Sequence, residues 1–263
     1  MKAIVFLGGG RITSALVAGL RQAGSKVSMV VYDRHPGKLR ALKRQHRIIA
    51  EPDLERAVRR ASLLVVAVRP SSVAHLLREI GRVDRPLVAI SLAAGVPLRT
   101  LQGQAGKSVQ WARAMPSPAC RTRRGLTAIT FARGLPAEAR EEVRKLFARV
   151  GAVAEIPESR FDAFTVTYST SHGYHALATL AGAAEKIGLD RKSAWIAAAH
   201  GLADGILLWR EGKLSVNELV HEAATPGGVA ATVMAAMDKA GYLRMVEQAL
   251  RAGVARAKAN ARG

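Results

Sequence analysis

The feature that constrains this chain most is a glycine triplet close to its start. A short apolar run over residues 3–7 is followed at once by Gly8, Gly9 and Gly10, and an amphipathic pattern then continues to Gly24. A run that is apolar at every position is typical of a parallel strand buried on both faces, whereas the spacing after it is helical. The sequence therefore predicts a strand, a tight turn and a helix in the first 24 residues.

The same alternation continues through the first half of the chain. Amphipathic segments separate most of the apolar runs, and Pro36 stands where a helix can open without losing a hydrogen bond. Further strands are predicted at residues 27–32, 63–68, 87–92, 109–113 and 127–131. This order of elements predicts an α/β domain of the Rossmann type, with a doubly wound parallel sheet.

After about residue 157 the strand pattern stops. Helices are predicted over residues 161–187, 191–210, 215–223 and 228–259, with glycines between them and many interior positions occupied by Ala or Gly. Small residues allow helices to approach closely. We therefore expect two domains, an α/β domain over 1–157 and an all-α domain over 158–263.

Composition and charge narrow the class of protein. The chain has 263 residues, of which 49% are apolar, and its longest apolar stretch, over residues 86–98, is too short to span a bilayer. Cys120 is the only cysteine and the N-terminus lacks the pattern of a signal peptide, so we expect a cytoplasmic protein without disulfides.

The net charge of +20 is concentrated in the first half. Residues 1–157 hold 28 basic and 10 acidic side chains, whereas residues 158–263 hold 12 and 10. Such an excess fits either a nucleic-acid surface or an Arg-rich surface that attracts an anionic cofactor. The basic residues are scattered rather than arranged in a stripe, so we expect no nucleic-acid partner as the main function.

The glycine turn predicts a dinucleotide site. In such a turn the first glycine permits the tight bend, the second lets backbone amides approach the pyrophosphate, and the helix N-terminus adds its dipole. The residues expected to hold the pyrophosphate are Gly8, Gly10, Arg11 and Ile12. Thr13 stands where Gly or Ala is usual, and a purely structural turn is the alternative.

The end of the second predicted strand bears on the choice of dinucleotide. Asp33 would hold the ribose 2′-hydroxyl of NAD, whereas Arg34 would pair with the 2′-phosphate of NADP. With Arg11 and Lys38 expected nearby, and with the strong positive charge of this half, we expect NADPH to be preferred and NADH to be an alternative. A solvated turn is the competing interpretation of Asp33 and Arg34.

Five segments give the chain a resemblance to the pyrroline-5-carboxylate reductase family along nearly its whole length. They are Phe6-Leu7-Gly8-Gly9-Gly10, Ala67-Val68-Arg69-Pro70, Ser91-Leu92-Ala93-Ala94-Gly95-Val96, Arg113-Ala114-Met115-Pro116 and Thr225-Pro226-Gly227-Gly228. The resemblance implies an N-terminal Rossmann domain and a helical domain that dimerises. It also implies reduction of a cyclic imine acid to proline with NADPH or NADH.

The resemblance also implies roles for particular residues. It places Val68, Arg69 and Pro70 beside the nicotinamide ribose, and Ala93, Ala94 and Gly95 under the nicotinamide ring. Met115 and Pro116 would form another wall of the cleft. These segments follow predicted strands, where open α/β sheets bind ligands. A close-packed turn is the alternative for residues 93–95.

The substrate half departs from the family pattern. Ser117-Pro118-Ala119 stands where the family has Asn-Thr-Pro, and Val229-Ala230 stands where it has two threonines. The hydroxyl- and glycine-rich stretch of the family corresponds to residues 168–174 here, and Ser171 and Tyr174 retain part of that pattern.

Candidates for catalysis lie in the same stretch. On a continuous helix, Tyr168, Ser171, His172 and His175 would share one face by their i, i+3, i+4 spacing. Tyr168 or His172 would then donate a proton or hold a substrate carboxylate, with Ser171 as a ligand contact; helix–helix packing is the alternative. Gly227 and Gly228 would offer free amides to a carboxylate at a helix start.

The expected function is therefore NAD(P)H-dependent reduction of a cyclic imine acid by a homodimer or a larger assembly of dimers. An imine arrives protonated and needs no strong acid, and the first long helix of the second half contains no Lys before Lys186. We expect no metal. The alternatives are another small imine or carbonyl substrate and an inactive dinucleotide-binding paralogue.

Overall fold

The computed structural model describes residues 3–102 and 104–260. The outermost residues of the two predicted domains, 1–2 and 261–263, lie outside the described residues. The chain forms two compact units. The first comprises residues 1–167 and 252–263, and the second comprises residues 168–251. The predicted boundary between 157 and 158 stays a prediction.

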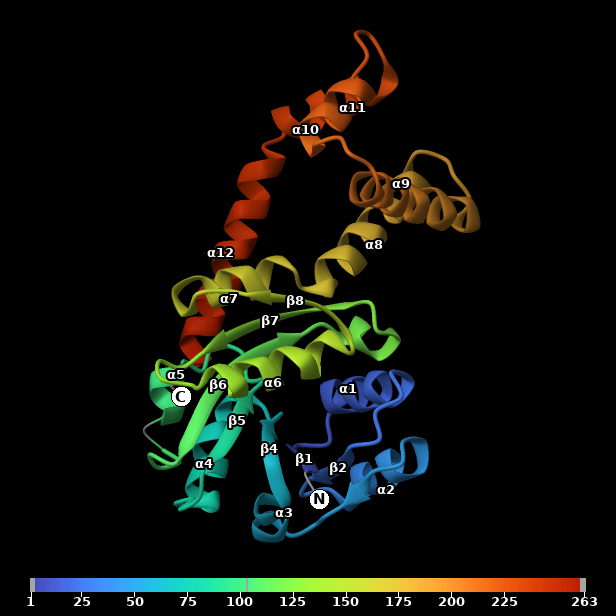
Figure 1. Ribbon diagram of the computed structural model, residues 1–263. Coiled ribbons are helices and arrows are strands. Elements are labelled where there is room, and N and C mark those ends of the chain that lie inside the picture. The colour runs from blue at the N-terminus through green and yellow to red at the C-terminus, as the bar shows by residue number, and fades with distance from the viewer. Residues whose placement is uncertain (1–2, 103, 261–263) are drawn as a thin grey trace. The chain divides into compact units, whose positions relative to one another are not determined.

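The first unit is built on one eight-stranded sheet with helices on both faces (Figure 1). Its strands are β1 Ala3–Leu7, β2 Ser28–Tyr32, β3 Ile49–Ala50, β4 Ala61–Val66, β5 Leu87–Ser91, β6 Val109–Pro116, β7 Gly125–Phe131 and β8 Gly151–Glu155. The strand order is β3-β2-β1-β4-β5-β6-β7-β8. This arrangement confirms the predicted Rossmann-type fold.

One strand pair is antiparallel. β6 pairs antiparallel with β7, and all the other neighbours in the sheet are parallel. Only a short 3-10 helix, η1 Pro118–Thr122, connects these two strands, and a parallel pair needs a much longer crossover. The sequence patterns missed β3, which is two residues long, and β8, whose Gly-Ala-Val-Ala-Glu sequence carries little strand preference.

Alternating strand residues bury the helices of the first unit on opposite faces. Val5 and Leu7 contribute to one cluster with α3, α4 and α5, whereas Ile4 and Phe6 contribute to the other with α1, α2 and α6. These helices are α1 Arg11–Gln22, α2 Pro36–Gln45, α3 Leu54–Arg60, α4 Pro70–Ile80, α5 Leu98–Gln102 and α6 Ala137–Ala148. The helix predicted to open at Pro36 is confirmed.

The helical half differs from its prediction at two joints. Its helices are α7 Glu158–Thr167, α8 Thr170–Lys186, α9 Arg191–Glu211, α10 Val216–Ala223, α11 Val229–Lys239 and α12 Tyr242–Asn260. The single helix expected over residues 161–187 is wrong, because α7 ends at Thr167. Thr165 and Thr167 turn their hydroxyls back to the carbonyls of Asp162 and Ala163, which competes with continued helix.

The helix expected over residues 228–259 is also divided. Gly241 has φ of +77°, a left-handed conformation that ends α11 at little steric cost. At other helix starts the sequence supplies caps: the Asp190 carboxylate accepts from the amides of Lys192 and Ser193, and Ser215 with Glu218 forms a capping box before α10.

Candidate functional site

The glycine turn lies at the carboxyl end of β1. Gly8 has φ of +112°, and a Cβ atom on it would lie 2.6 Å from the carbonyl oxygen of Ala67. A Cβ on Gly10, in contrast, would meet nothing within 4 Å. Position 8 therefore requires glycine, because another residue would be strained at this positive φ and its Cβ would clash with the backbone after β4. Position 10 faces open space at the start of α1.

The start of α1 suits an anion. Gly10 occupies the N-cap position without a side-chain cap, and the first turn of the helix holds no acidic residue. Arg11 is exposed in that turn, and the buried Thr13 donates its hydroxyl to the carbonyl of Gly8 at 2.5 Å. Thr13 therefore braces the turn from inside, which explains how a threonine serves where a small residue is usual. The helix dipole and the exposed guanidinium leave this end positive.

Asp33, which follows β2, stabilises the same turn through its side-chain hydrogen bonds. Its Oδ2 accepts from the amide of Gly9 at 2.8 Å, and its Oδ1 accepts from the amide of His35 at 2.8 Å. His35 Nδ1 and Lys38 Nζ also lie 3.0 and 3.4 Å from these oxygens. Burial opposes ionisation, but these donors outweigh it and hold the pKa of Asp33 below its ordinary value.

Arg34 points to a different partner. It forms an ion pair with Glu79 near the end of α4 at 2.5 Å, and both side chains are partly exposed. The Glu79 carboxylate and Tyr32 raise the pKa of Arg34 above its ordinary value. Arg11 and Arg69 are both exposed, and neither forms an ion pair with another described residue. The carboxyl edge of β1, β2 and β4 thus presents several cations near the glycine turn.

The other predicted cofactor and substrate segments of the first unit share this edge of the sheet. Val68, Arg69 and Pro70 follow β4, with Pro70 as the first residue of α4. Ala93, Ala94 and Gly95 follow β5, and Met115 and Pro116 end β6, which runs parallel to β5. Because parallel strands end at one edge, the structure brings these residues to the same side as the glycine turn.

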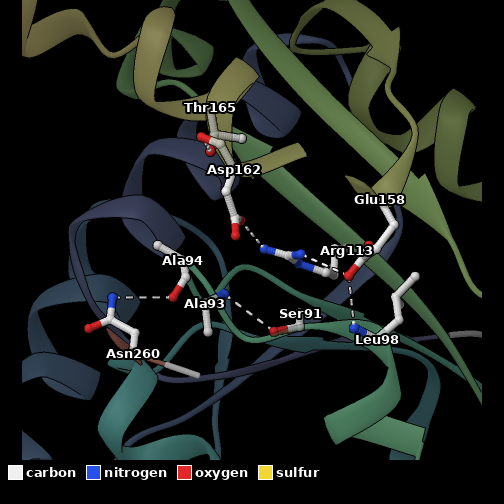
Figure 2. A network of polar contacts seen from close by, with 9 residues as sticks. All are labelled: Ser91, Ala93, Ala94, Leu98, Arg113, Glu158, Asp162, Thr165 and Asn260. Carbon is white, nitrogen blue, oxygen red and sulfur yellow. Dashed lines mark hydrogen bonds and ion pairs between the residues drawn. The ribbon is translucent and has the colours of Figure 1, made fainter. Parts of the chain in front are cut away.

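A polar network surrounds the loop after β5 (Figure 2). The buried Arg113 on β6 donates to Glu158 Oε1 at 2.9 Å and to Asp162 Oδ1 at 2.7 Å. Glu158 Oε1 also accepts the amide of Leu98 at 3.0 Å. At the other end of the loop, Ser91 Oγ accepts the amide of Ala93 at 3.3 Å. Sequence patterns missed Glu158 and Asp162; the signal available was a single arginine inside an apolar strand.

The predicted catalytic residues belong to the second unit. Ser171 and His172 are exposed in the first turns of α8, and Ser171 Oγ lies 2.8 Å from Ser169 Oγ. Tyr168 precedes the helix, so the expectation that it shares a helical face with Ser171, His172 and His175 is wrong. The break at residues 168–169 removes the periodicity on which that expectation depended.

Gly227 and Gly228 precede α11 as predicted, but one of the expected free amides is used. Gly227 has φ of +74°, and the amide of Gly228 donates to the carbonyl of Thr225 at 2.9 Å. The expectation of a free amide at Gly228 is therefore wrong, because the turn that positions the residue also consumes its donor. The role of both glycines toward a substrate stays a prediction.

Residues 3–102 and 104–260 hold neither a candidate metal cluster nor a candidate membrane span. Within these ranges, His, Cys, Asp and Glu side chains do not gather in a group of three that would hold a metal ion. No helix in the described part of the chain is long and apolar enough to cross a membrane.

Comparison with known proteins gives matches to both halves. Residues 3–95 match the family model described as NADP oxidoreductase coenzyme F420-dependent, and residues 158–260 match the model of the pyrroline-5-carboxylate reductase dimerisation domain. Pyrroline-5-carboxylate reductase of Mycobacterium tuberculosis is 27% identical over 98% of this chain and 96% of its own length.

Solved structures share the fold. The chain resembles 1-pyrroline-5-carboxylate reductase of Streptococcus pyogenes with a TM-score of 0.89 at 21% identity, over 98% of each chain. It also resembles the pyrroline carboxylate reductase of Plasmodium falciparum, determined with NADP bound, with a TM-score of 0.86 at 20% identity over 99% and 98% of the two chains.

Proposed function

Because this chain belongs to the pyrroline-5-carboxylate reductase family, we propose that it reduces pyrroline-5-carboxylate to proline with NADPH. The observation that carries the proposal is the likeness to curated reductases over nearly the whole chain, which includes both the nucleotide-binding half and the helical half. The reaction is an oxidoreduction at a C=N bond.

The first unit supplies a cradle that fits a dinucleotide. Gly8 forms the bend, the open face at Gly10 admits a phosphate, and Arg11 and Ile12 begin the helix whose N-terminus faces that phosphate. The ribose and nicotinamide contacts are assigned to Val68, Arg69, Pro70, Ala93, Ala94 and Gly95. When bound, the nicotinamide supplies a hydride. The chain's own part is to hold the acceptor carbon in position.

We assign the preference for NADPH to Arg34. Both Asp33 oxygens already accept backbone amides, so this carboxylate is poorly placed to serve a ribose 2′-hydroxyl as well. Arg34 is exposed enough to exchange its partner Glu79 for a phosphate, which offers more acceptor oxygens and more charge. Asp33 is then a brace for the turn, and NADH is the weaker cofactor.

Catalysis on this substrate makes modest demands on the protein. A protonated imine accepts hydride at its carbon and keeps its proton on nitrogen, so no side chain has to deliver a proton in that step. Met115 and Pro116 are assigned to the wall of the substrate cleft. Ser171 and His172, with Tyr168, are assigned to hold or protonate the imine acid, and the amides near Gly227 and Gly228 to bind its carboxylate.

The working form is a cytoplasmic homodimer, and a larger assembly of dimers is the alternative. Within the described residues 168–251, only Ala181, Ala194 and Ala198 are buried, whereas Leu208 and Trp209 on α9 are 62% and 48% exposed. A second copy is the natural cover for such a unit, in agreement with the dimerisation model that it matches. The basic surface of the first unit serves the anionic cofactor, and nucleic acid is no partner.

A second candidate function is reduction of a different cyclic imine acid. It is favoured by Val229 and Ala230, which stand just after the Pro-Gly-Gly turn and offer no hydroxyl to a substrate. A third, binding of the dinucleotide without catalysis, would share the cradle but not the reaction.

Oxidation of NADPH in the presence of pyrroline-5-carboxylate separates these functions. We expect turnover with NADPH, slower turnover with NADH, and none from the Gly8→Ala variant. Binding of NADPH without turnover would contradict the proposal; a panel of other cyclic imine acids would then test the second candidate.

A further inference from the structure

The loop of residues 93–98, which follows β5, is fixed on several sides. Gly95 has φ of +78°, and a Cβ atom on it would overlap the backbone of Ala257 in α12. The Asn260 side chain donates to the carbonyl of Ala94 at 3.4 Å, and Gly253 packs against Val166 in α7. The last turns of α12 thus pack tightly on the loop, because glycine leaves no side chain between the two backbones.

Glu158 fixes the far end of this loop. It is the first residue of α7, and its Oε1 accepts both the Leu98 amide at 3.0 Å and Arg113 at 2.9 Å. The Arg113 side chain is 2% exposed, and Phe161 covers it with its ring centroid 4.5 Å from Cζ. A guanidinium so buried is held in one place, because moving it would leave its charge unpaired. Glu158 is therefore a bridge from a fixed strand residue to the loop (Figure 2).

Asp162 offers an internal comparison. It pairs with the same guanidinium at 2.7 Å and lies one helical turn after Glu158 in α7. The Asp162 carboxylate accepts from Arg113, whereas the Glu158 carboxylate also accepts from the Leu98 amide of the loop. The two carboxylates thus share the task of neutralising Arg113, but only Glu158 connects the cation to residue 98.

We propose that Glu158 is a positioning residue for the nicotinamide end of the cofactor: by joining Arg113 to the Leu98 amide, it fixes the 93–98 loop on which the ring rests. This inference rests on the proposed function, which assigns Ala93, Ala94 and Gly95 to the nicotinamide. It goes beyond that assignment, because Glu158 itself touches neither cofactor nor substrate in the proposal and acts through the loop.

The test compares matched variants of the full chain, Glu158→Ala and Asp162→Ala. Each leaves Arg113 with one carboxylate, so a merely structural role predicts similar losses in thermal stability and in function. Glu158→Gln is the conservative variant, because an amide oxygen still accepts from Leu98 and Arg113. Glu158→Asp keeps the charge beside Arg113 but is one methylene shorter, and it replaces Glu158→Ala if that protein does not fold.

The readout is binding of two ligands measured by calorimetry. NADPH carries the nicotinamide, whereas 2′-phospho-ADP-ribose has the same phosphates and adenosine without the ring. We expect Glu158→Ala to weaken NADPH binding about tenfold, the usual effect of losing one hydrogen bond to a charged group, and to leave 2′-phospho-ADP-ribose binding within about twofold. Glu158→Gln should restore most of the affinity, and Asp162→Ala should bind both ligands like the wild type.

Equal weakening of both ligands by Glu158→Ala, or equal effects of the Glu158 and Asp162 variants on NADPH, would overturn the proposal. Because neither ligand contains the substrate, these binding measurements test the loop proposal independently of the proposed reaction. If the proposed reaction is wrong, the wild-type protein will bind NADPH without reducing pyrroline-5-carboxylate. In the active enzyme, Glu158→Ala should lower kcat with little change in the KM for the imine.

Discussion

The two compact units of this chain differ in how completely they bury their own apolar side chains. Residues 3–167 cover both faces of the sheet, and large side chains such as Phe6, Trp111 and Phe147 are at most 1% exposed. In the described residues 168–251, three alanines are the only buried side chains, although Ile206, Leu207, Leu208 and Trp209 form a consecutive apolar run on α9.

This difference separates two tasks. The first unit has the buried core of an independent domain, so that its turns and loops can be held rigidly around a cofactor. The second unit exposes apolar surface that a soluble monomer seldom tolerates, and a second copy of the chain can complete its core. We therefore expect mutations in the first unit to act through folding and cofactor binding, and mutations in the second to act through assembly and substrate binding.

Glycine substitutions should give the largest contrast between the units. Gly8→Ala places a Cβ 2.6 Å from a backbone oxygen at a positive φ, and we expect a loss of about 3 kcal/mol or more in the free energy of unfolding. Gly182→Ala in α8 meets nothing within 4 Å, and the better helix propensity of Ala predicts a gain of up to about 1 kcal/mol. Chemical denaturation measures both, and equal losses would break the comparison.

Assembly should respond to charges on α9. The double variant Leu208→Asp, Trp209→Asp should raise the dimer dissociation constant at least about 100-fold, because aromatic and aliphatic anchors dominate such interfaces. Lys213→Asp, an exposed change of charge next to the same helix, is the control and should leave the dimer intact. Analytical ultracentrifugation gives the constants, and a double variant that dimerises like the wild type would contradict a shared apolar core.

Cofactor preference should be confined to the first unit. Arg34→Ser should lower kcat/KM for NADPH about 30-fold and change that for NADH less than about threefold, because only NADPH carries the 2′-phosphate. Glu79→Gln removes the competitor of that phosphate and should raise the preference for NADPH about two- to threefold, within the range of exposed ion pairs. Steady-state kinetics with both cofactors measures the ratio; equal losses for NADPH and NADH would remove Arg34 from this role.

The smallest effect concerns the reactivity of Cys120. Burial raises the pKa of its thiol from 9.0 to about 11, although Arg121 acts in the opposite direction. At pH 8 the thiolate population should be about 100-fold smaller than for a free thiol, so a disulfide reagent should label the native protein slowly and the unfolded protein at once. The folded protein holds the thiol proton more tightly than the unfolded chain does, so the contribution of Cys120 to the free energy of unfolding is fully present below pH 9. That contribution is lost as the pH rises through 11. Fast labelling in the native state would contradict a closed core.

The sequence predicted the α/β half better than the helical half for a physical reason. Runs such as Ala3–Leu7 are apolar at every position because both faces are covered, and glycine at position 8 is required by the neighbouring strand, so the pattern and the structure agree. The helical half carries Ala and Gly at many interior positions, and its joint between α7 and α8 has side-chain hydrogen bonds at Thr165 and Thr167 that no periodicity reveals.

The site was predictable where local backbone determines it and less so where distant residues meet. Asp33 was expected at the end of β2, but its engagement with Gly9, 24 residues away, follows only from the pairing of β1 with β2. The bridge from Arg113 through Glu158 to Leu98 joins three elements, and the packing of Ala257 on Gly95 joins the C-terminal helix to a loop more than 160 residues earlier in the chain. Contacts of this kind are set by tertiary structure, so single-sequence patterns do not contain them.

The central claim, that the chain transfers a hydride to pyrroline-5-carboxylate, is tested most directly with deuterated NADPH. The protein is incubated with pyrroline-5-carboxylate and NADPH carrying deuterium at C4 of the nicotinamide, prepared as each of the two stereoisomers, and the proline formed is analysed by mass spectrometry. We expect one deuterium on the δ-carbon of proline from one stereoisomer and none from the other. Proline without deuterium from either stereoisomer, or the absence of proline while NADPH binds, would contradict it.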